Sequence, residues 1–197
     1  MRDTESACRG TETSSIFRNP ALFAIAGMAL FLTASSTIAS TSSRTGAASP
    51  GKMRSALQAM YDLENAAAGK KNAHGMLAYV SPKFVGVDAK GKHVTYDDLR
   101  DSAQQVFDMA ANLQAGTIVR DCKVTGDKAV VHVDDEVRIV VSGPDKDKTH
   151  VVDTSSSKDT WTKTPAGWRL TSSRTLTHKV TVDGQPTDDD SMGLPSF

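Results

Sequence analysis

The apolar residues of this chain change their spacing after Thr117, and this change constrains the fold more than any other feature. From Met53 onward, hydrophobic residues recur at the three- and four-residue steps of amphipathic helices. Beyond Thr117, valine and isoleucine alternate with polar residues, which is the period of a half-exposed β-strand. A chain with helices first and long alternating segments second packs its helices onto an antiparallel sheet. The sequence therefore predicts an α+β domain.

Three helices are predicted. The first covers residues 53–69 and ends at a glycine, and the second covers residues 72–79. The third begins at Thr95, an N-cap with Asp98 three residues later, and ends at Gly116. The face expected to be buried on the first helix holds Leu57, Met60, Tyr61, Leu63 and Ala66, and that of the third holds Leu99, Ala103, Val106, Phe107, Ala110 and Leu113.

A small hairpin and four long strands complete the expected domain. The hairpin covers residues 83–94 and turns at Asp88-Ala-Lys-Gly91, after Pro82 has ended the second helix. Turn signals at residues 125–127, 143–147 and 164–167 separate the four strands. Because the strands are long, we expect a strongly curved antiparallel sheet with the helices on its concave face.

The N-terminal segment predicts export. The apolar run of residues 20–32 has the length of a signal-peptide core and is short for a membrane-spanning helix. We expect cleavage after Ala39, which gives residues 1–39 as a signal peptide and a secreted or periplasmic protein. The alternative is a retained membrane anchor. Residues 40–51 are expected to form a flexible linker, residues 52–183 the domain and residues 184–197 a disordered tail.

Composition excludes several classes of function. The net charge is zero and the basic residues are scattered, so no nucleic-acid partner is expected. The two cysteines, Cys8 and Cys122, form no disulfide framework, and Cys122 is expected to be a buried apolar residue. The run Asp188-Asp-Asp190 lacks a loop scaffold, so we expect no metal site, and no cofactor motif is present.

The domain resembles the nuclear-transport-factor-2-like superfamily, also called SnoaL-like or cystatin-like. The matching pieces are Tyr61, residues 84–91, the strand entry at residues 126–131 and the segment 161–170, which reads Trp-Thr-Lys-Thr-Pro-Ala-Gly-Trp-Arg-Leu. The resemblance covers about residues 53–182. It implies a cone-shaped fold, and it leaves the activity open, because the superfamily mixes enzymes with transport and assembly modules.

Three side chains are candidates for catalysis. The resemblance places Asp88 near the carboxylate base of the superfamily's isomerases, with Tyr61 as an oxyanion donor; otherwise Asp88 opens its turn and Tyr61 is a core residue. His132 and Asp134 share one strand face, which Asp153 on the next strand could join to orient a general base. The alternative is a solvated or dimer-facing sheet surface shared with Arg138, Lys158 and Arg174.

Aromatic residues are the candidates for a ligand pocket: Phe84, Phe107, Trp161 and Trp168. The two tryptophans flank the last turn and could pair across it, either as core packing or as a wall on which a ligand stacks.

We expect a non-catalytic exported domain that binds a small apolar ligand or a partner, with a homodimer formed through the sheet face. One alternative is an isomerase or dehydratase that uses Asp88 with Tyr61 or His132. The other is an accessory domain tethered to a membrane by an uncleaved N-terminus.

Overall fold

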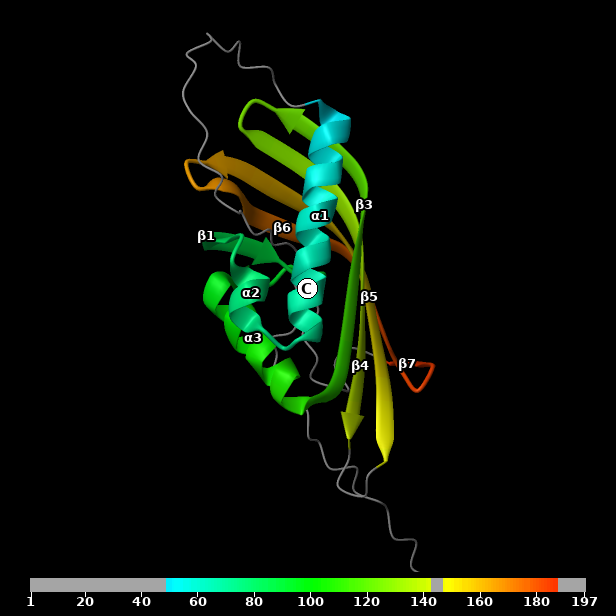
Figure 1. Ribbon diagram of the computed structural model, residues 1–197. Helices are drawn as coiled ribbons and strands as arrows, with labels where there is room; N and C mark the ends of the chain where they lie inside the picture. Colours follow the sequence, from blue (N-terminus) through cyan, green and yellow to red (C-terminus); the bar gives the residue numbers. More distant parts are fainter. Residues whose placement is uncertain (1–48, 143–146, 188–197) are drawn as a thin grey trace, which may run out of the picture.

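A computed structural model describes residues 49–142 and 147–187 (Figure 1). The predicted signal peptide, most of the linker and the acidic run lie outside the described residues, so export stays a prediction. No helix among the described residues is long and apolar enough to cross a membrane. The elements are α1 (Pro50–Gly69), α2 (Ala73–Leu77), β1 (Val80–Val87), β2 (His93–Thr95), α3 (Tyr96–Met109), β3 (Ala110–Thr125), β4 (Lys128–Ser142), β5 (Lys148–Thr164), β6 (Gly167–Val182) and β7 (Gln185–Thr187).

Helix α1 buries one face, and that face differs from the prediction at two positions. Leu57 and Tyr61 have no exposed surface, as expected, but Leu63 is 43% exposed and Ala66 is exposed as well. Two residues after Tyr61, Leu63 is turned about 200° around the helix and cannot share its face. The buried position one turn after Tyr61 belongs instead to Glu64, which has no exposed surface.

Helix α3 begins as predicted and ends earlier. Thr95 and Asp98 form a capping box, in which each side chain accepts a hydrogen bond from the other residue's backbone amide. The helix was expected to continue to Gly116, but it ends at Met109, and β3 follows without a loop. Leu113 is opposite Ile139 in the sheet, so pairing with β4 satisfies the backbone that local spacing had assigned to a helix.

The sheet contains seven strands in the described residues. Its order is β2-β1-β6-β5-β4-β3, and β7 pairs with β6. The four long strands β3 to β6 are antiparallel, as predicted, whereas β1 lies parallel to β6. Because Gln185–Thr187 pairs with β6, the expectation of a disordered tail is wrong for these three residues. Figure 1 shows the three helices on one side of the sheet, which we call the inner face; the strong curvature stays a prediction.

Side chains of α1 cover the edge strand β3. Arg54 donates from Nε and Nη2 to the carbonyl oxygen of Val119 at 3.1 and 2.8 Å. Gln58 donates to the carbonyl oxygen of Thr117 at 2.8 Å and accepts from the amide of Val119 at 2.9 Å. These bonds occupy backbone groups that an uncovered edge would offer to another chain.

The hydrophobic core lies between the inner face and the helices. Cys122 is buried as a free thiol, as predicted, and Cys8 lies outside the described residues. The largest apolar side chains without exposed surface, or nearly so, are Trp161, Tyr61, Phe84, Leu57, Met76, Leu99 and Leu170.

Two leucines of α1 provide a matched test of this packing. Leu57→Ala is expected to lower the free energy of unfolding by about 2–5 kcal/mol, because it leaves a cavity in the core. Leu63→Ala removes the same atoms from an exposed site, and we expect a change within about 0.5 kcal/mol. Urea denaturation of the two variants measures both values. Equal losses would show that α1 is rotated relative to the orientation described.

Candidate functional site

Strand alternation places polar side chains on the inner face, where a core would ordinarily be apolar. On β4, Asp135 interrupts a run of inward-facing valines. On β5, the inward positions between Val151 and Trp161 are all polar: Asp153, Ser155, Ser157 and Asp159. Buried polar groups are costly without partners, so their contacts show what this region can do.

Tyr61 connects α1 to these polar side chains. Its hydroxyl donates to Asp159 Oδ2 at 2.7 Å and accepts from Trp161 Nε1 at 3.0 Å. The two rings meet edge to face, with centroids 5.6 Å apart. Burial raises the pKa of Tyr61 well above its usual value, and the carboxylate of Asp159 raises it further. Tyr61 therefore keeps its proton and acts as a hydrogen-bond donor.

Glu64 is the most unusual group in the interior. It has no exposed surface, and neither of its carboxyl oxygens has a hydrogen-bond partner among the described residues. Burial raises its pKa well above the usual value, and the negative charges of Asp159 and Asp135 add to the effect. Glu64 is therefore expected to be neutral at neutral pH.

Asp135 lies between this interior and the surface. It is half-buried, and its Oδ1 accepts a hydrogen bond from Thr117 Oγ1 at 2.7 Å. Burial raises its pKa to about 8, the bond from Thr117 opposes that shift, and the charges of Asp159 and Asp153 support it. A carboxyl group that titrates near neutrality can donate or accept a proton under physiological conditions.

A second polar pair lies beside Asp135. His178 Nε2 is 3.0 Å from Asp153 Oδ2, and the two side chains are 2% and 5% exposed. Asp153 lies opposite Val180, so His178 is its diagonal neighbour on the inner face. A carboxylate in this position fixes the orientation of the imidazole ring.

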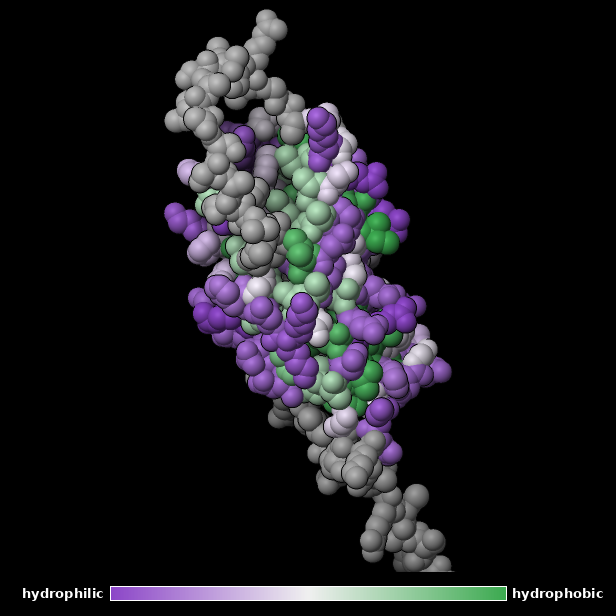
Figure 2. Space-filling model, viewed as in Figure 1, coloured by the Kyte–Doolittle hydropathy of each residue, from purple (hydrophilic) through white to green (hydrophobic). Residues whose placement is uncertain are grey.

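Asp135, Thr117 and His178 contribute to the wall of an open groove of about 1100 Å³. Figure 2 shows one side of the molecule, where hydrophilic side chains predominate and hydrophobic areas are limited in extent. The groove runs from α1 across β3, β4, β5 and β6, and it is lined by Asp62, Asn65, Ala66, Gly69, Leu113, Gln114, Ala115, Gly116, Thr117, Ile118, Arg120, Asp134, Asp135, Glu136, Thr154, Ser155, Ser156, Thr177, His178 and Lys179.

Asp88 lies in its turn, away from the groove lining. It is 7% exposed, and its Oδ1 accepts hydrogen bonds from the amides of Lys90 and Lys92 at 2.9 and 2.7 Å. These are the bonds by which an aspartate initiates a turn. The hydroxyl of Tyr61 bonds to Asp159 and Trp161, so the structure does not bring the predicted pair together. A catalytic role for Asp88 stays a prediction.

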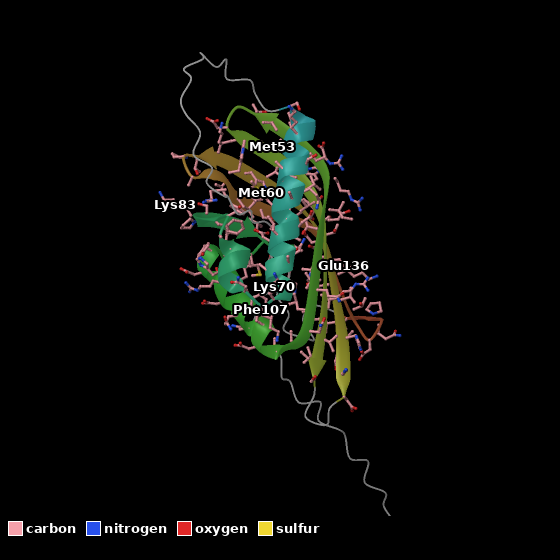
Figure 3. All side chains as sticks on the ribbon, viewed as in Figure 1. Met53, Met60, Lys70, Lys83, Phe107 and Glu136 are labelled. Carbon is pink, nitrogen blue, oxygen red and sulfur yellow. The ribbon has the colours of Figure 1, made fainter. Side chains whose placement is uncertain are left out.

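His132 lies on the outer face of the sheet, in register with Lys158. Asp134 shares this face, as predicted, and forms an ion pair with Arg120 at 2.6 Å. Asp153 does not join them, because it lies opposite Val137 and therefore points to the inner face. Figure 3 shows Glu136 on the side of the sheet away from α1. The homodimer through this outer face stays a prediction.

The four aromatic candidates lie in or against the core, and none lines the groove. Phe107 borders a separate apolar cavity of about 10 Å³, roughly the volume that one water molecule requires. Trp161 lies opposite Leu170 and Trp168 opposite Lys163, so the tryptophans are diagonal neighbours and not a direct cross-strand pair. Their role as a ligand pocket stays a prediction.

Glu64, Asp135, Asp159 and His178 were not predicted as site residues, and three of them had a signal. Glu64 lies seven residues after Leu57 and three after Tyr61, on the apolar helix face. Asp135 and Asp159 fall at positions that alternation assigns to the core. No group of three or more histidine, cysteine or acidic side chains in the described ranges is arranged to hold a metal ion.

No family model matches this sequence, and no curated protein sequence matches it either. Solved structures do. A protein from Novosphingobium aromaticivorans provisionally named as an aromatic ring hydroxylase is 18% identical, with a TM-score of 0.54 over 72% of this chain and 98% of its own. A second protein from that organism, provisionally named as a scytalone dehydratase, is 13% identical, with a TM-score of 0.52 over 66% and 87%.

A third structure names the architecture. It is a nuclear transport factor 2-like superfamily protein from Salmonella enterica, 16% identical, with a TM-score of 0.50 over 70% of this chain and 94% of its own. Likeness at this level of identity establishes the fold and leaves the function open. The described domain, with its helices on one face of a mostly antiparallel sheet, has the nuclear transport factor 2-like α+β fold.

Proposed function

We propose that this domain binds a small molecule in the groove between α1 and strands β3 to β6. The observation that carries the proposal is that Thr117, Asp135 and His178, which come from three different strands, all lie in the wall of one open groove. A groove with a few convergent polar groups is the usual form of a small-molecule site. A scaffold domain has no need to keep such groups in its interior, where they cost stability.

The strands hold these groups in fixed positions. Thr117 and Asp135 are hydrogen-bonded across β3 and β4, and Asp153 orients His178. A ligand therefore meets donors and acceptors that are already placed, which lowers the entropic cost of binding. Because its pKa is about 8, Asp135 is mostly protonated at pH 7 and can donate as well as accept a hydrogen bond.

Acid–base catalysis is a second candidate, and the contact between His178 and Asp153 favours it. A histidine oriented by a carboxylate can remove a proton from carbon, and the protonated carboxyl of Asp135 can return one. The provisional naming of one solved neighbour as a dehydratase is consistent with chemistry of this kind. Binding remains the first proposal, because no group in residues 49–142 and 147–187 identifies a particular reaction.

Filling the groove tests the binding proposal. Ala66 is exposed on α1 and lines the groove, so Ala66→Phe is expected to fold with its ring in the groove. We expect a set of neutral, cationic and anionic fragments to shift the amide resonances of groove residues in ¹H–¹⁵N spectra. In Ala66→Phe these fragments should bind at least about tenfold more weakly. Ala59→Phe, at an exposed alanine of α1 outside the groove lining, is the control. Shifts that cluster elsewhere, or that survive Ala66→Phe, would contradict the proposal.

The catalytic candidate predicts exchange of carbon-bound hydrogen. In D₂O, a fragment with an acidic C–H bond should lose its proton to solvent faster when the protein is present, and mass spectrometry follows the exchange. Replacing His178 with Gln should slow that exchange by a factor of about 10²–10⁴. His132→Gln, on the outer face, should leave it unchanged. Without any protein-dependent exchange, the catalytic candidate is lost and the binding proposal stands.

The neutral state of Glu64 predicts how stability changes with pH. The unfolded chain loses the proton of Glu64 near pH 4.3, while the folded chain keeps it to a higher pH. Between these two pKa values the folded state binds more protons, so the free energy of unfolding falls as pH rises. We expect Glu64→Gln to remove up to about 1.4 kcal/mol per pH unit of that fall. Urea denaturation at pH 5, 6 and 7 measures the slope.

Glu136→Gln is the control for this measurement, because its side chain is 47% exposed on the outer face. Its stability should change with pH in parallel with the unmodified protein. If Glu64→Gln also gave a parallel line, Glu64 would be ionised in the folded state.

A further inference from the structure

We infer that the ligand of this groove carries a positively charged nitrogen and that this group binds against Asp135, with Glu64 and Asp159 behind it. The inference rests on the proposed binding function and names the chemical class of the ligand. It is carried by the placement of charge, by the unpartnered oxygens of Glu64 and by the hydrogen-bond inventory of the interior.

The interior beside the groove contains acidic groups and almost no basic ones. Glu64, Asp153 and Asp159 are all buried, and the half-buried Asp135 joins them at the groove wall. No lysine or arginine among residues 49–142 and 147–187 is buried. The one basic side chain nearby is His178, which Asp153 already engages. Buried carboxyl groups are ordinarily paired with cations, so this interior lacks a counter-charge.

The hydrogen bonds of this interior show a matching shortage of donors. Tyr61 donates to Asp159, Trp161 donates to Tyr61 and Thr117 donates to Asp135. After these bonds are counted, both oxygens of Glu64 and Oδ1 of Asp159 still have no partner among the described residues. The large majority of buried side-chain polar atoms in proteins do have one. The interior is therefore rich in acceptors and short of donors.

Glu64 is buried behind the groove wall and does not line the groove itself. The residues that follow it on α1, Asn65 and Ala66, both line the groove, and the charges of Asp159 and Asp135 act on Glu64. A cation against Asp135 thus has two further carboxyl groups behind it. Ammonium and guanidinium groups supply N–H donors and a positive charge together, which are the two properties that this interior lacks.

The outer part of the groove has the same sign of charge. The whole lining includes four acidic side chains and three basic ones, of which one is His178. Arg120 and Asp134 neutralise each other at 2.6 Å, which leaves three acidic side chains against Lys179 and His178. An anionic ligand would be repelled by this arrangement. A neutral carbonyl ligand would accept a bond from protonated Asp135 but would bring no positive charge to the buried carboxyl groups.

Binding of a cation should release protons, because an opposite charge favours the ionised form of a carboxyl group. Asp135 and Glu64 are the groups expected to lose them. The charges of Asp134, Asp153 and Asp159 act on Asp135, to which Thr117 donates a hydrogen bond. The charge of Asp159 also acts on Glu64, and Asp135 and Glu64 act in turn on Tyr61 and Tyr79.

Three probes with one carbon skeleton test the inference: phenethylamine, phenethyl alcohol and phenylacetate. Isothermal titration calorimetry at pH 7 should give the amine a dissociation constant at least about tenfold below that of the alcohol, with phenylacetate the weakest. Titrations of the amine in phosphate and in Tris should give different heats, which reports proton release.

Asp135→Asn should raise the dissociation constant of the amine to about that of the alcohol and should leave the alcohol unaffected. Asp121→Asn, at an exposed carboxylate of β3 outside the groove lining, is the matched control and should retain the preference for the amine. Thermal unfolding checks that each variant folds, and Glu64→Gln replaces Asp135→Asn if the latter does not.

The outcomes separate this inference from the proposed function. If the alcohol or phenylacetate binds in the groove as tightly as the amine, the domain is a binding protein and the cationic ligand is wrong. If Asp135→Asn keeps the full preference for the amine, the cation does not bind where we place it, and the inference fails. Binding of none of the three probes, with no shift of groove resonances, counts against both.

Discussion

The hydrogen bond from Tyr61 to Asp159 is the contact on which the rest of the site depends. It joins α1 to the middle of β5 at 2.7 Å, and the indole of Trp161 completes it from the same strand. An apolar contact would let α1 slide along the sheet or turn about its axis at little cost. This hydrogen bond fixes both the rotation of α1 and its position along the sheet. Once Tyr61 is fixed, helical geometry places Glu64 one turn further along the same face. The site is a consequence of how the helix is attached.

This attachment also explains why a small core can contain several carboxyl groups. An ionised carboxylate without a partner would cost several kcal/mol in such an environment. The chain avoids that cost by keeping Glu64 neutral and by giving Asp159 donors, namely Tyr61 and Ser173. The remaining cost is the unmet bonding capacity of Glu64 and of Asp159 Oδ1. Natural proteins keep a deficit of this kind mainly where function requires it.

Much of the fold could be predicted from local signals. The prediction was correct wherever a feature depends on a few neighbouring residues. The capping box of Thr95 and Asp98, the turn after Asp88 and the change to two-residue alternation are features of this kind. The end of α3 was not predicted correctly, because it does not depend on neighbouring residues alone. Residues 110–116 keep a helical spacing and are extended only through pairing with β4. Alternation alone left open which face Asp153 occupies, because the register between β4 and β5 is a long-range property.

The position of His178 shows why the site itself could not be read from the alternation. On β6, Ser173 and Thr175 face inward, and unbroken alternation would put His178 on the outer face. The pairing with β5 shifts between Ser156 and Ser157, which leaves Leu176 as an extra residue, 52% exposed. That insertion reverses the alternation, so His178 faces inward beside Asp153. One extra residue in β6 thus places a histidine in the groove. The spacing of residues in the sequence does not predict this, because the position of the bulge depends on how β6 pairs with β5.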